Sequence, residues 1–247
     1  MSISHLEDQL AAWFRKPSLR EVYRHWFKEV QQWLLEGPTF EIGSGIGRLS
    51  ESIEDIVTID ILKTPWTDIV GTAESLPMRR RSVSNLVLFD VLHHLPRPTL
   101  FFHEALRVLQ DGGRVIVSDP YVSPLSTFVY KHFHPEPVDI DCDPFQPEVP
   151  LSSTEPFDAN QAIGTLLFYR QLEKWQEQFS KFEVIFRKRF AFIAYPATGG
   201  FGFRSLLPGK VISWIQDREK LLSPLSPVLA FRLLVVLEKK YSMADGC

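Results

Sequence analysis

Residues 40–50 read FEIGSGIGRLS, a short apolar strand that runs into glycines at alternate positions. Glycines at a strand end let the backbone take positive φ and approach a ligand closely, and free amides there favour an anionic group. Gly43, Gly45 and Gly47 are spaced G-x-G-x-G, and Arg48 stands where the dinucleotide fingerprint G-x-G-x-x-G requires glycine. We therefore expect a ligand-binding loop that takes neither NAD nor FAD. The lack of a G-K-[ST] sequence also excludes a phosphate-binding P-loop.

Predicted strands and helices alternate along the chain around this loop. We expect strands at 39–42, 56–60, 69–71, 85–90, 114–118, 182–190 and 233–238. We expect helices at 19–36, 48–54, 99–110, 159–179 and 211–222, with Asp111-Gly112-Gly113 ending the third of them. Apolar strands that alternate with helices predict an α/β fold, with helices on both faces of a mainly parallel sheet.

One segment departs from this alternation. Eight of the 18 prolines lie between Pro120 and Pro156. Each proline removes a backbone donor and fixes φ, so we expect little regular structure there. Long irregular segments in compact domains are often functional.

The composition of the 247 residues is that of a globular protein. Apolar residues make up 45%, charged residues 23%, and the net charge is −3, so a nucleic-acid partner is not expected. The first 20 residues lack an apolar signal-peptide core, and no apolar stretch is long enough for a membrane span. The two cysteines, Cys142 and Cys247, form no C-x-x-C motif, which fits a reducing, cytoplasmic location.

An acidic residue, Asp60, closes the second predicted strand, IVTID at 56–60. A carboxylate at that edge of a sheet can accept hydrogen bonds from both hydroxyls of a ribose. Because Asp60 follows the glycine loop by one short helix and one strand, we expect it to bind the ribose of a nucleoside-containing cofactor.

Five stretches of the chain occur in the order of one enzyme family. They are FEIGSGIGRLS at 40–50, IVTID at 56–60, GTAESLPM at 71–78, NLVLFDVLHHLPRP at 85–98 and HEALRVLQDGGRVIVSDP at 103–120. Through them the chain resembles a class I S-adenosylmethionine-dependent methyltransferase of the type 11 family. The resemblance implies a Rossmann-like sheet of seven strands, mainly parallel with an antiparallel last strand, and S-adenosylmethionine as the cofactor.

The resemblance also implies roles for individual residues. Glu41 would order the glycine loop, Asp60 would hold the ribose, and Ala73 would offer its amide to the adenine. Further cofactor contacts are implied for Gly43, Ser44, Gly45, Gly47, Ile61, Asp90 and Val91. Thr72 stands where the family commonly has an acid, so we expect Thr72 or Glu74 to substitute for it. Trp66 is a candidate for covering the adenine, with ordinary packing as the alternative.

We expect one methyltransferase domain over residues 1–247. Its parts are an N-terminal helical segment at 1–38, a cofactor-binding half at 39–120, cap insertions within 121–230 around the strand 182–190, and the last strand at 231–240. The cap segments would lie over the carboxyl ends of the strands, where such sheets bind their ligands.

The resemblance implies a small-molecule substrate, and the expected cap combines many aromatic residues with scattered cations. An apolar or aromatic metabolite with an anionic group would suit such a site. His94 and Tyr121 are the candidate catalytic residues, and Arg204 is expected near the substrate. Asp119, after the fifth strand of the cofactor half, is a further substrate-site candidate.

Two other functions stay open at this point: methyl transfer to a protein or nucleic acid, and cofactor binding without catalysis. His132 and His134 precede a run of acidic residues, but their proline-broken spacing fits no standard metal motif. We therefore expect no metal ion. The acceptor atom and the oligomeric state are not predicted.

Overall fold

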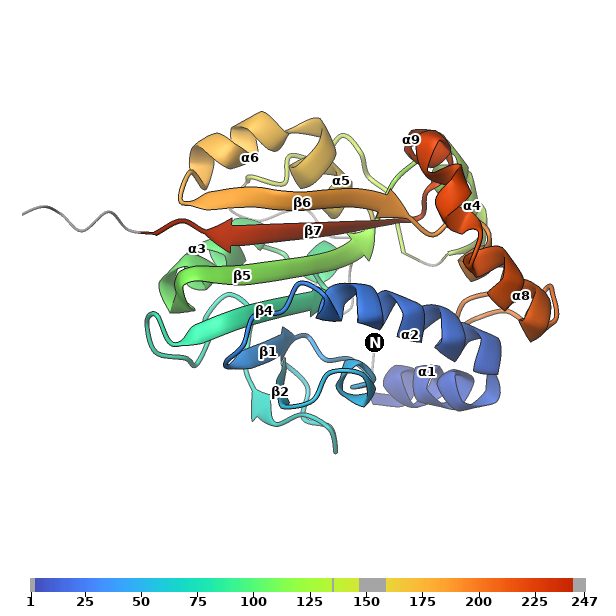
Figure 1. Ribbon diagram of the computed structural model, residues 1–247, viewed down its shortest axis with the longest axis horizontal. Helices are drawn as coiled ribbons and strands as arrows, with labels where there is room; N and C mark the ends of the chain where they lie inside the picture. The colour runs from blue at the N-terminus through green and yellow to red at the C-terminus, as the bar shows by residue number, and fades with distance from the viewer. Residues whose placement is uncertain (1–2, 135, 147–158, 242–247) are drawn as a thin grey trace, which may run out of the picture.

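A seven-stranded sheet in the order β3-β2-β1-β4-β5-β7-β6 forms the centre of the computed structural model, which describes residues 3–134, 136–146 and 159–241 (Figure 1). Its strands are β1 (Thr39–Ile42), β2 (Ile56–Asp60), β3 (Ile69–Val70), β4 (Val83–Phe89), β5 (Leu109–Pro120), β6 (Phe182–Phe190) and β7 (Arg232–Lys239). β1 to β5 run parallel, and β7 runs antiparallel to both of its neighbours. The predicted fold, a mainly parallel sheet with an antiparallel last strand, is confirmed.

The middle strands are buried on both faces, as their apolar sequences predict. All seven residues of β4 are buried, and β6 has the bounds expected from its alternating pattern. β5 is longer than expected. It begins directly after a helix and takes up Asp111-Gly112-Gly113 as an irregularity in its pairing with β4. Gly112 has φ +78° there, so its conformational freedom serves this irregular strand rather than a helix end.

Helices cover both faces of the sheet. α2 (Pro17–Gln31) presents the buried side chains Leu19, Val22, Trp26 and Val30 at three- and four-residue spacing to one face. It ends five residues earlier than the predicted helix. α3 (Pro98–Val108) covers the other face.

The helix expected over 159–179 is divided into shorter pieces. They are α5 (Ile163–Thr165), the π-helical turn η3 (Leu166–Arg170) and α6 (Leu172–Gln178). Trp175 of α6 packs on Phe102 of α3 and on Phe182 of β6, with ring centroids 5.4 and 6.1 Å apart. This piece therefore covers a face of the sheet beside α3, whereas we expected it to belong to a cap over the strand ends.

Other helices gather at the end of the sheet toward which the parallel strands point (Figure 1). They are α4 (Pro124–Phe133), α8 (Gly209–Gln216) and α9 (Ser226–Leu229), with the short helix α7 (Ala194–Ala197) and the 3₁₀ segment η4 (Glu219–Leu225) between β6 and β7. α4 lies in the proline-rich segment where we expected little regular structure. Ser123 caps its first turn and Pro124 occupies the first position, where a proline costs no hydrogen bond. Residues 147–158 of that segment lie outside the described residues, as does Cys247.

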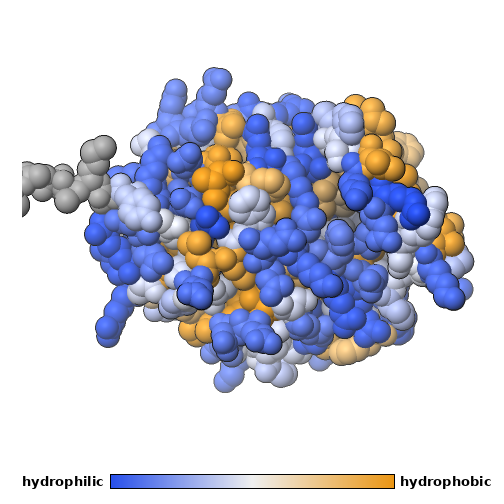
Figure 2. Space-filling model, viewed as in Figure 1, coloured by the Kyte–Doolittle hydropathy of each residue, from blue (hydrophilic) through white to orange (hydrophobic). Residues whose placement is uncertain are grey.

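Before α2 lies a further helix, α1 (Ile3–Arg15), within the expected N-terminal helical segment, and it packs beside α2. Leu6, Ala12 and Trp13 of α1 are buried. Apolar side chains are exposed elsewhere, among them Trp214 of α8 and Val228 of α9. Figure 2 shows apolar patches on the surface, some of them at the end of the molecule where α8 and α9 lie. Within the described residues, no helix is both long enough and apolar enough to cross a bilayer.

Candidate active site

A cavity of about 960 Å³ lies at the carboxyl ends of β1, β2 and β4. The strand order reverses between β1 and β4, and this is the place where open α/β sheets bind ligands. The volume is at the upper end of the range for small-molecule sites, roughly 300–1,000 Å³. The glycine loop lines one part of the cavity, and aromatic side chains from α1, α2 and α7 line another.

At two of the three loop glycines, a bulky neighbouring side chain leaves no room for a Cβ atom. A Cβ on Gly43, whose φ is +70°, would lie 2.6 Å from the side chain of Val91, and one on Gly47 would lie 2.4 Å from the ring of Trp66. Gly45 has φ +52° with no such neighbour, and it lines the cavity with Gly43. Gly47 is not among the lining residues, and the cofactor contact at Gly47 stays a prediction.

Trp66 packs against the glycine loop. Its indole nitrogen donates a 2.6 Å hydrogen bond to the carbonyl oxygen of Gly45, and its ring lies against Gly47. Trp66 is not among the lining residues. It supports the glycine loop from outside, which corresponds to the packing alternative and not to a cover over the adenine.

The helix expected after the loop, over 48–54, is a single 3₁₀ turn, η1 (Leu49–Glu51). A turn of three residues has almost no macrodipole, so it does not provide the anion-binding helix end that we inferred. The amide of Gly45 instead donates a 2.9 Å hydrogen bond to Asp60 Oδ2. The loop is thus held by a carboxylate and by the Trp66 indole.

Asp60 lies at the end of β2 and lines the cavity, as predicted. Oδ2 accepts the amide of Gly45, and Oδ1 accepts the amide of Leu62 at 2.8 Å. A carboxylate has about four acceptor positions, so each oxygen retains one for a ribose hydroxyl. Ile61, half exposed beside Asp60, gives the same wall an apolar surface.

Glu41 and Ser44 line the loop end of the cavity and are buried. Glu41 Oε2 and Ser44 Oγ have no hydrogen-bond partner among the described residues. Burial, followed by the repulsion of Asp60, raises the pKa of Glu41 to about 8. Buried polar atoms without partners are costly, so they mark a place that fits the polar part of a ligand.

Thr72, Ala73 and Glu74 line the cavity on the far side of Asp60, where the family resemblance places the adenine. Glu74 pairs with Arg97 through Oε2, while its buried Oε1 has no hydrogen-bond partner among the described residues. Thr72 Oγ1 accepts the amide of Glu74 at 3.3 Å. Of these three residues, Glu74 therefore has a side-chain oxygen that can accept a hydrogen bond from a ligand.

Asp90 follows β4 with φ +58° and lines the cavity beside Val91. Its Oδ1 lies 2.6 Å from a guanidinium nitrogen of Arg232, and its Oδ2 accepts the hydroxyl of Tyr23 at 3.4 Å. The sequence analysis missed Arg232. The signal for it was a lone cation at the start of an otherwise apolar strand, because a buried charge there requires a partner.

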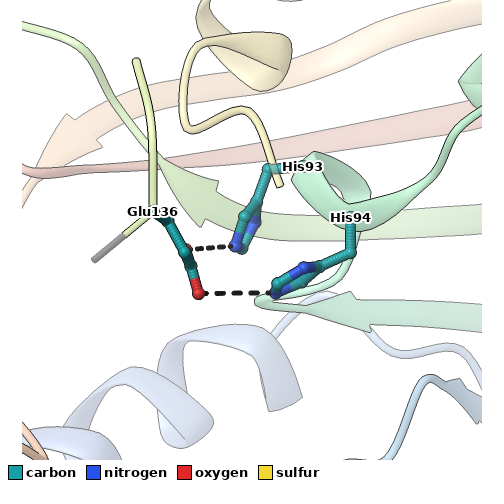
Figure 3. A group of neighbouring side chains, drawn as sticks. All are labelled: His93, His94 and Glu136. Atoms are coloured by element: carbon teal, nitrogen blue, oxygen red, sulfur yellow. Dashed lines mark ion pairs between the residues drawn. The ribbon is translucent and has the colours of Figure 1, made fainter. Parts of the chain in front are cut away.

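Four ionisable side chains meet beside Val91. His93 and His94 come from the 3₁₀ turn η2 (Leu92–His94), and Glu136 approaches them from the chain after α4 (Figure 3). His93 Nε2 lies 3.4 Å and His94 Nε2 lies 3.9 Å from the Glu136 carboxylate. Asp119 Oδ1 lies 2.8 Å from Nδ1 of His93. Burial alone would raise the pKa of Glu136, but the hydrogen bond from His93 and the neighbouring imidazoles hold it at about 2.

His94 lines the cavity, in agreement with its predicted place, and Asp119 supports His93 from behind instead of facing a substrate. Tyr121 does not line the cavity. Its hydroxyl accepts a 3.2 Å hydrogen bond from Arg189, and its ring packs on Tyr169. Arg204 is exposed and is not a lining residue either. The structure therefore does not bring Tyr121 or Arg204 to the cavity wall where we expected them.

The part of the cavity beyond Asp90 has an aromatic wall that comes mostly from outside the predicted cap. Trp13 of α1, Tyr23 and Phe27 of α2, Tyr195 of α7 and Phe201 line it. The ring centroid of Tyr23 lies 5.8 Å from that of Trp13 and 5.6 Å from that of Phe201. The sequence analysis predicted a helix at 19–36 but did not place its aromatic residues in the site.

Comparison with known proteins bears on residues 40–117 and on the fold of the chain. Residues 40–117 match the family model of the methyltransferase domain. An uncharacterised protein of Methanocaldococcus jannaschii, MJ1123, is 24% identical over 118 residues. That match spans 44% of this chain and 57% of the relative.

Among similar solved structures is a SAM-dependent methyltransferase from Archaeoglobus fulgidus, with a TM-score of 0.54 and 13% identity over 89% of this chain and 94% of that one. Burkholderia thailandensis 1,6-didemethyltoxoflavin-N1-methyltransferase has a TM-score of 0.50 and 12% identity over 97% and 85%. The [4+2]-cyclase SpnF has a TM-score of 0.51 and 14% identity over 89% and 82%. At such identities the likeness shows the fold alone. Residues 40–117 thus resemble the methyltransferase domain in sequence, and the chain has the fold of the class I methyltransferases that use S-adenosylmethionine.

Proposed function

We propose that this protein transfers the methyl group of S-adenosylmethionine to a small molecule bound in the aromatic part of the cavity. The observation that carries the proposal is the continuity of the cavity from the glycine loop to the aromatic wall. Asp60 and Ser44 lie in the first part, and Trp13 and Phe201 in the second. One cavity can therefore hold a cofactor and an acceptor end to end.

The loop part provides a polar group for each portion of the cofactor. Asp60 has acceptor positions for the ribose hydroxyls, with Ile61 beside it. Ala73 and Glu74 lie where the adenine would be, and the unpartnered oxygens of Glu41 and Ser44 face its methionine portion. When bound, the cofactor supplies a methyl group already activated on a sulfonium.

The acceptor part favours an apolar or aromatic small molecule. Trp13 of α1 lines this part together with the rings of Tyr23, Phe27, Tyr195 and Phe201. The lining cations Arg48 and Arg232 are already paired with Glu51 and Asp90. The side chains act by aligning the acceptor and excluding water, and positioning of this kind gives effective molarities of about 10⁵ M or more.

The experiment is to incubate the pure protein with methyl-labelled S-adenosylmethionine and, in parallel, with the small-molecule fraction and the heat-treated protein and nucleic-acid fraction of a cell extract, and to identify what becomes labelled. We expect a labelled small molecule one methylene heavier than its precursor. Asp60→Ala is the inactive control, and Asp68→Asn, which lies outside the cavity, is the matched active one. Label found only in protein or nucleic acid would contradict the substrate class. Bound cofactor with no labelled product would contradict methyl transfer itself.

A further inference from the structure

The side chains His93, His94 and Glu136 bring three potential metal ligands to one point of the cavity wall. One ligand atom from each lies within 4.8 Å of the others. Ligands about 2.0–2.1 Å from a tetrahedral zinc ion lie about 3.4 Å from one another. The 3.4 and 3.9 Å separations from Glu136 to the two imidazoles are close to that value, and Figure 3 shows the three groups converging.

The surrounding residues hold two of these groups in the orientation that metal binding requires. Asp119, which is fully buried, binds Nδ1 of His93 at 2.8 Å, so that Nε2 is directed toward Glu136. The side-chain amide of Gln161 donates to Glu136 Oε2. A carboxylate behind the histidine is the usual outer partner of a metal-binding imidazole, because it fixes the tautomer and strengthens the ligand.

The charges of this cluster also suit a dication. Asp119 and Glu136 bring two carboxylates into a site that is largely buried, and their neighbours there are imidazoles. Arg232, the cation nearby, is engaged by Asp90 at 2.6 Å. A divalent ion would give these carboxylates the positive partner that a buried negative charge requires.

We propose that His93, His94 and Glu136 bind a divalent first-row transition-metal ion, with an open coordination position toward the cavity. Two histidines and one carboxylate with an open position form catalytic zinc sites and sites for other ions of this series. His134 is not part of the ligand set, because its Nδ1 accepts the amide of Glu136 at 3.3 Å.

The open position would take an ionisable oxygen of the acceptor, an inference that rests on the proposed function. On binding, the hydroxyl would release its proton to water, and a metal–oxygen bond would replace the O–H bond. A metal ion lowers the pKa of a bound hydroxyl strongly, so the oxygen becomes nucleophilic near neutral pH. The ion would then supply the positive charge that Arg204, which is exposed, does not.

The test begins with binding alone. Chelator-treated full-length protein is titrated with Zn²⁺ by calorimetry and with Co²⁺ by visible absorption, in the absence of cofactor and acceptor. We expect one equivalent of each ion to bind, with the absorption of Co²⁺ bound by nitrogen and oxygen ligands. His94→Ala and Glu136→Gln should each weaken binding by about ten-fold or more. His103→Ala, an exposed histidine on α3, should leave it unchanged.

Unfolding temperatures control for misfolding of the variants. Saturating Zn²⁺ should raise the unfolding temperature of the wild type and not that of folded His94→Ala. Zn²⁺ affinity equal in wild type, His94→Ala and Glu136→Gln would overturn the site, and the cluster would be an ion-pair network only. Because these readings need no turnover, a bound ion without methyl transfer would contradict the proposed function and leave the metal site standing. Methyl transfer without ion binding would do the reverse.

Discussion

The indole nitrogen of Trp66 donates a 2.6 Å hydrogen bond to the carbonyl oxygen of Gly45, and the same ring occupies the space that a side chain on Gly47 would need. The loop is therefore shaped by a residue 21 positions away. In this protein the support comes from an aromatic side chain, because only a 3₁₀ turn follows the loop.

Trp66→Phe keeps a ring beside Gly47 but removes the hydrogen bond to Gly45. The loss of one such bond costs about 1 kcal/mol, so we expect about five-fold weaker cofactor binding by calorimetry. Trp214→Phe, on the exposed face of α8, is the matched control and should bind as the wild type does. Equal affinities for the two variants would show that the indole does not support the loop.

Asp60→Asn should weaken cofactor binding more strongly. It removes the charge from the proposed ribose acceptor, and a hydrogen bond to a charged group contributes about 1.5–3 kcal/mol, or about ten- to one-hundred-fold in affinity. Asp68→Asn perturbs a carboxylate that accepts from the Thr58 backbone and hydroxyl outside the cavity. It should lower the unfolding temperature without changing cofactor affinity. An unchanged affinity in Asp60→Asn would contradict the ribose assignment.

Glu41 should make the cofactor-free protein less stable as the pH rises. Its pKa is about 8 in the folded state and near 4.5 in the unfolded chain. Between these values the unfolded chain has lost the proton that the folded protein keeps. The free energy of unfolding therefore falls with pH, by at most about 1.4 kcal/mol per pH unit from this residue.

Glu41→Gln removes that dependence, so its stability relative to wild type should improve steadily from pH 5 to pH 8. Urea unfolding at several pH values measures the difference. Glu183→Gln, an exposed position on β6, is the control and should follow the wild type. A constant difference between Glu41→Gln and wild type over this range would show that Glu41 ionises normally.

Tyr121→Phe should leave methyl transfer unchanged, contrary to the expectation from sequence. The hydroxyl accepts a hydrogen bond from Arg189 away from the cavity, so its removal should cost only about 0.5–1.5 kcal/mol of stability. Initial rates at saturating cofactor, with His94→Ala beside it, check this. A loss of rate in Tyr121→Phe as large as that in His94→Ala would restore Tyr121 to the site.

The predictable parts of the structure are those that local patterns determine. The alternating apolar residues of β6 predicted its bounds, and the glycine loop with the acid at the end of β2 predicted the cavity wall. α4 was missed because prolines were counted as helix breakers, although Pro124 stands at a first helical position. No separate helix was predicted at α1, because its apolar side chains pack on the aromatic face of α2. That pairing is visible only in the fold.

The site residues that escaped prediction depend on pairing across the fold. Arg232 is separated from Asp90 by most of the chain, and no local pattern connects them. Glu136 stood in the acidic run beside His132 and His134, the pair considered for a metal motif. Its neighbours in the structure are His93 and His94 from a distant turn. Sequence spacing identified the segment, but only the fold identified the partners.

The position of β7 has a consequence for the order of folding. This strand comes last among the strands yet inserts between β5 and β6, and it delivers Arg232 to Asp90. Until it emerges from the ribosome, β5 is an open edge with unpaired backbone groups, the kind of edge that invites association with other chains. The cofactor-binding half, residues 39–120, would by itself leave the edge of β5 unpaired and Asp90 without Arg232. A nascent chain therefore cannot complete this pocket until its final strand is made.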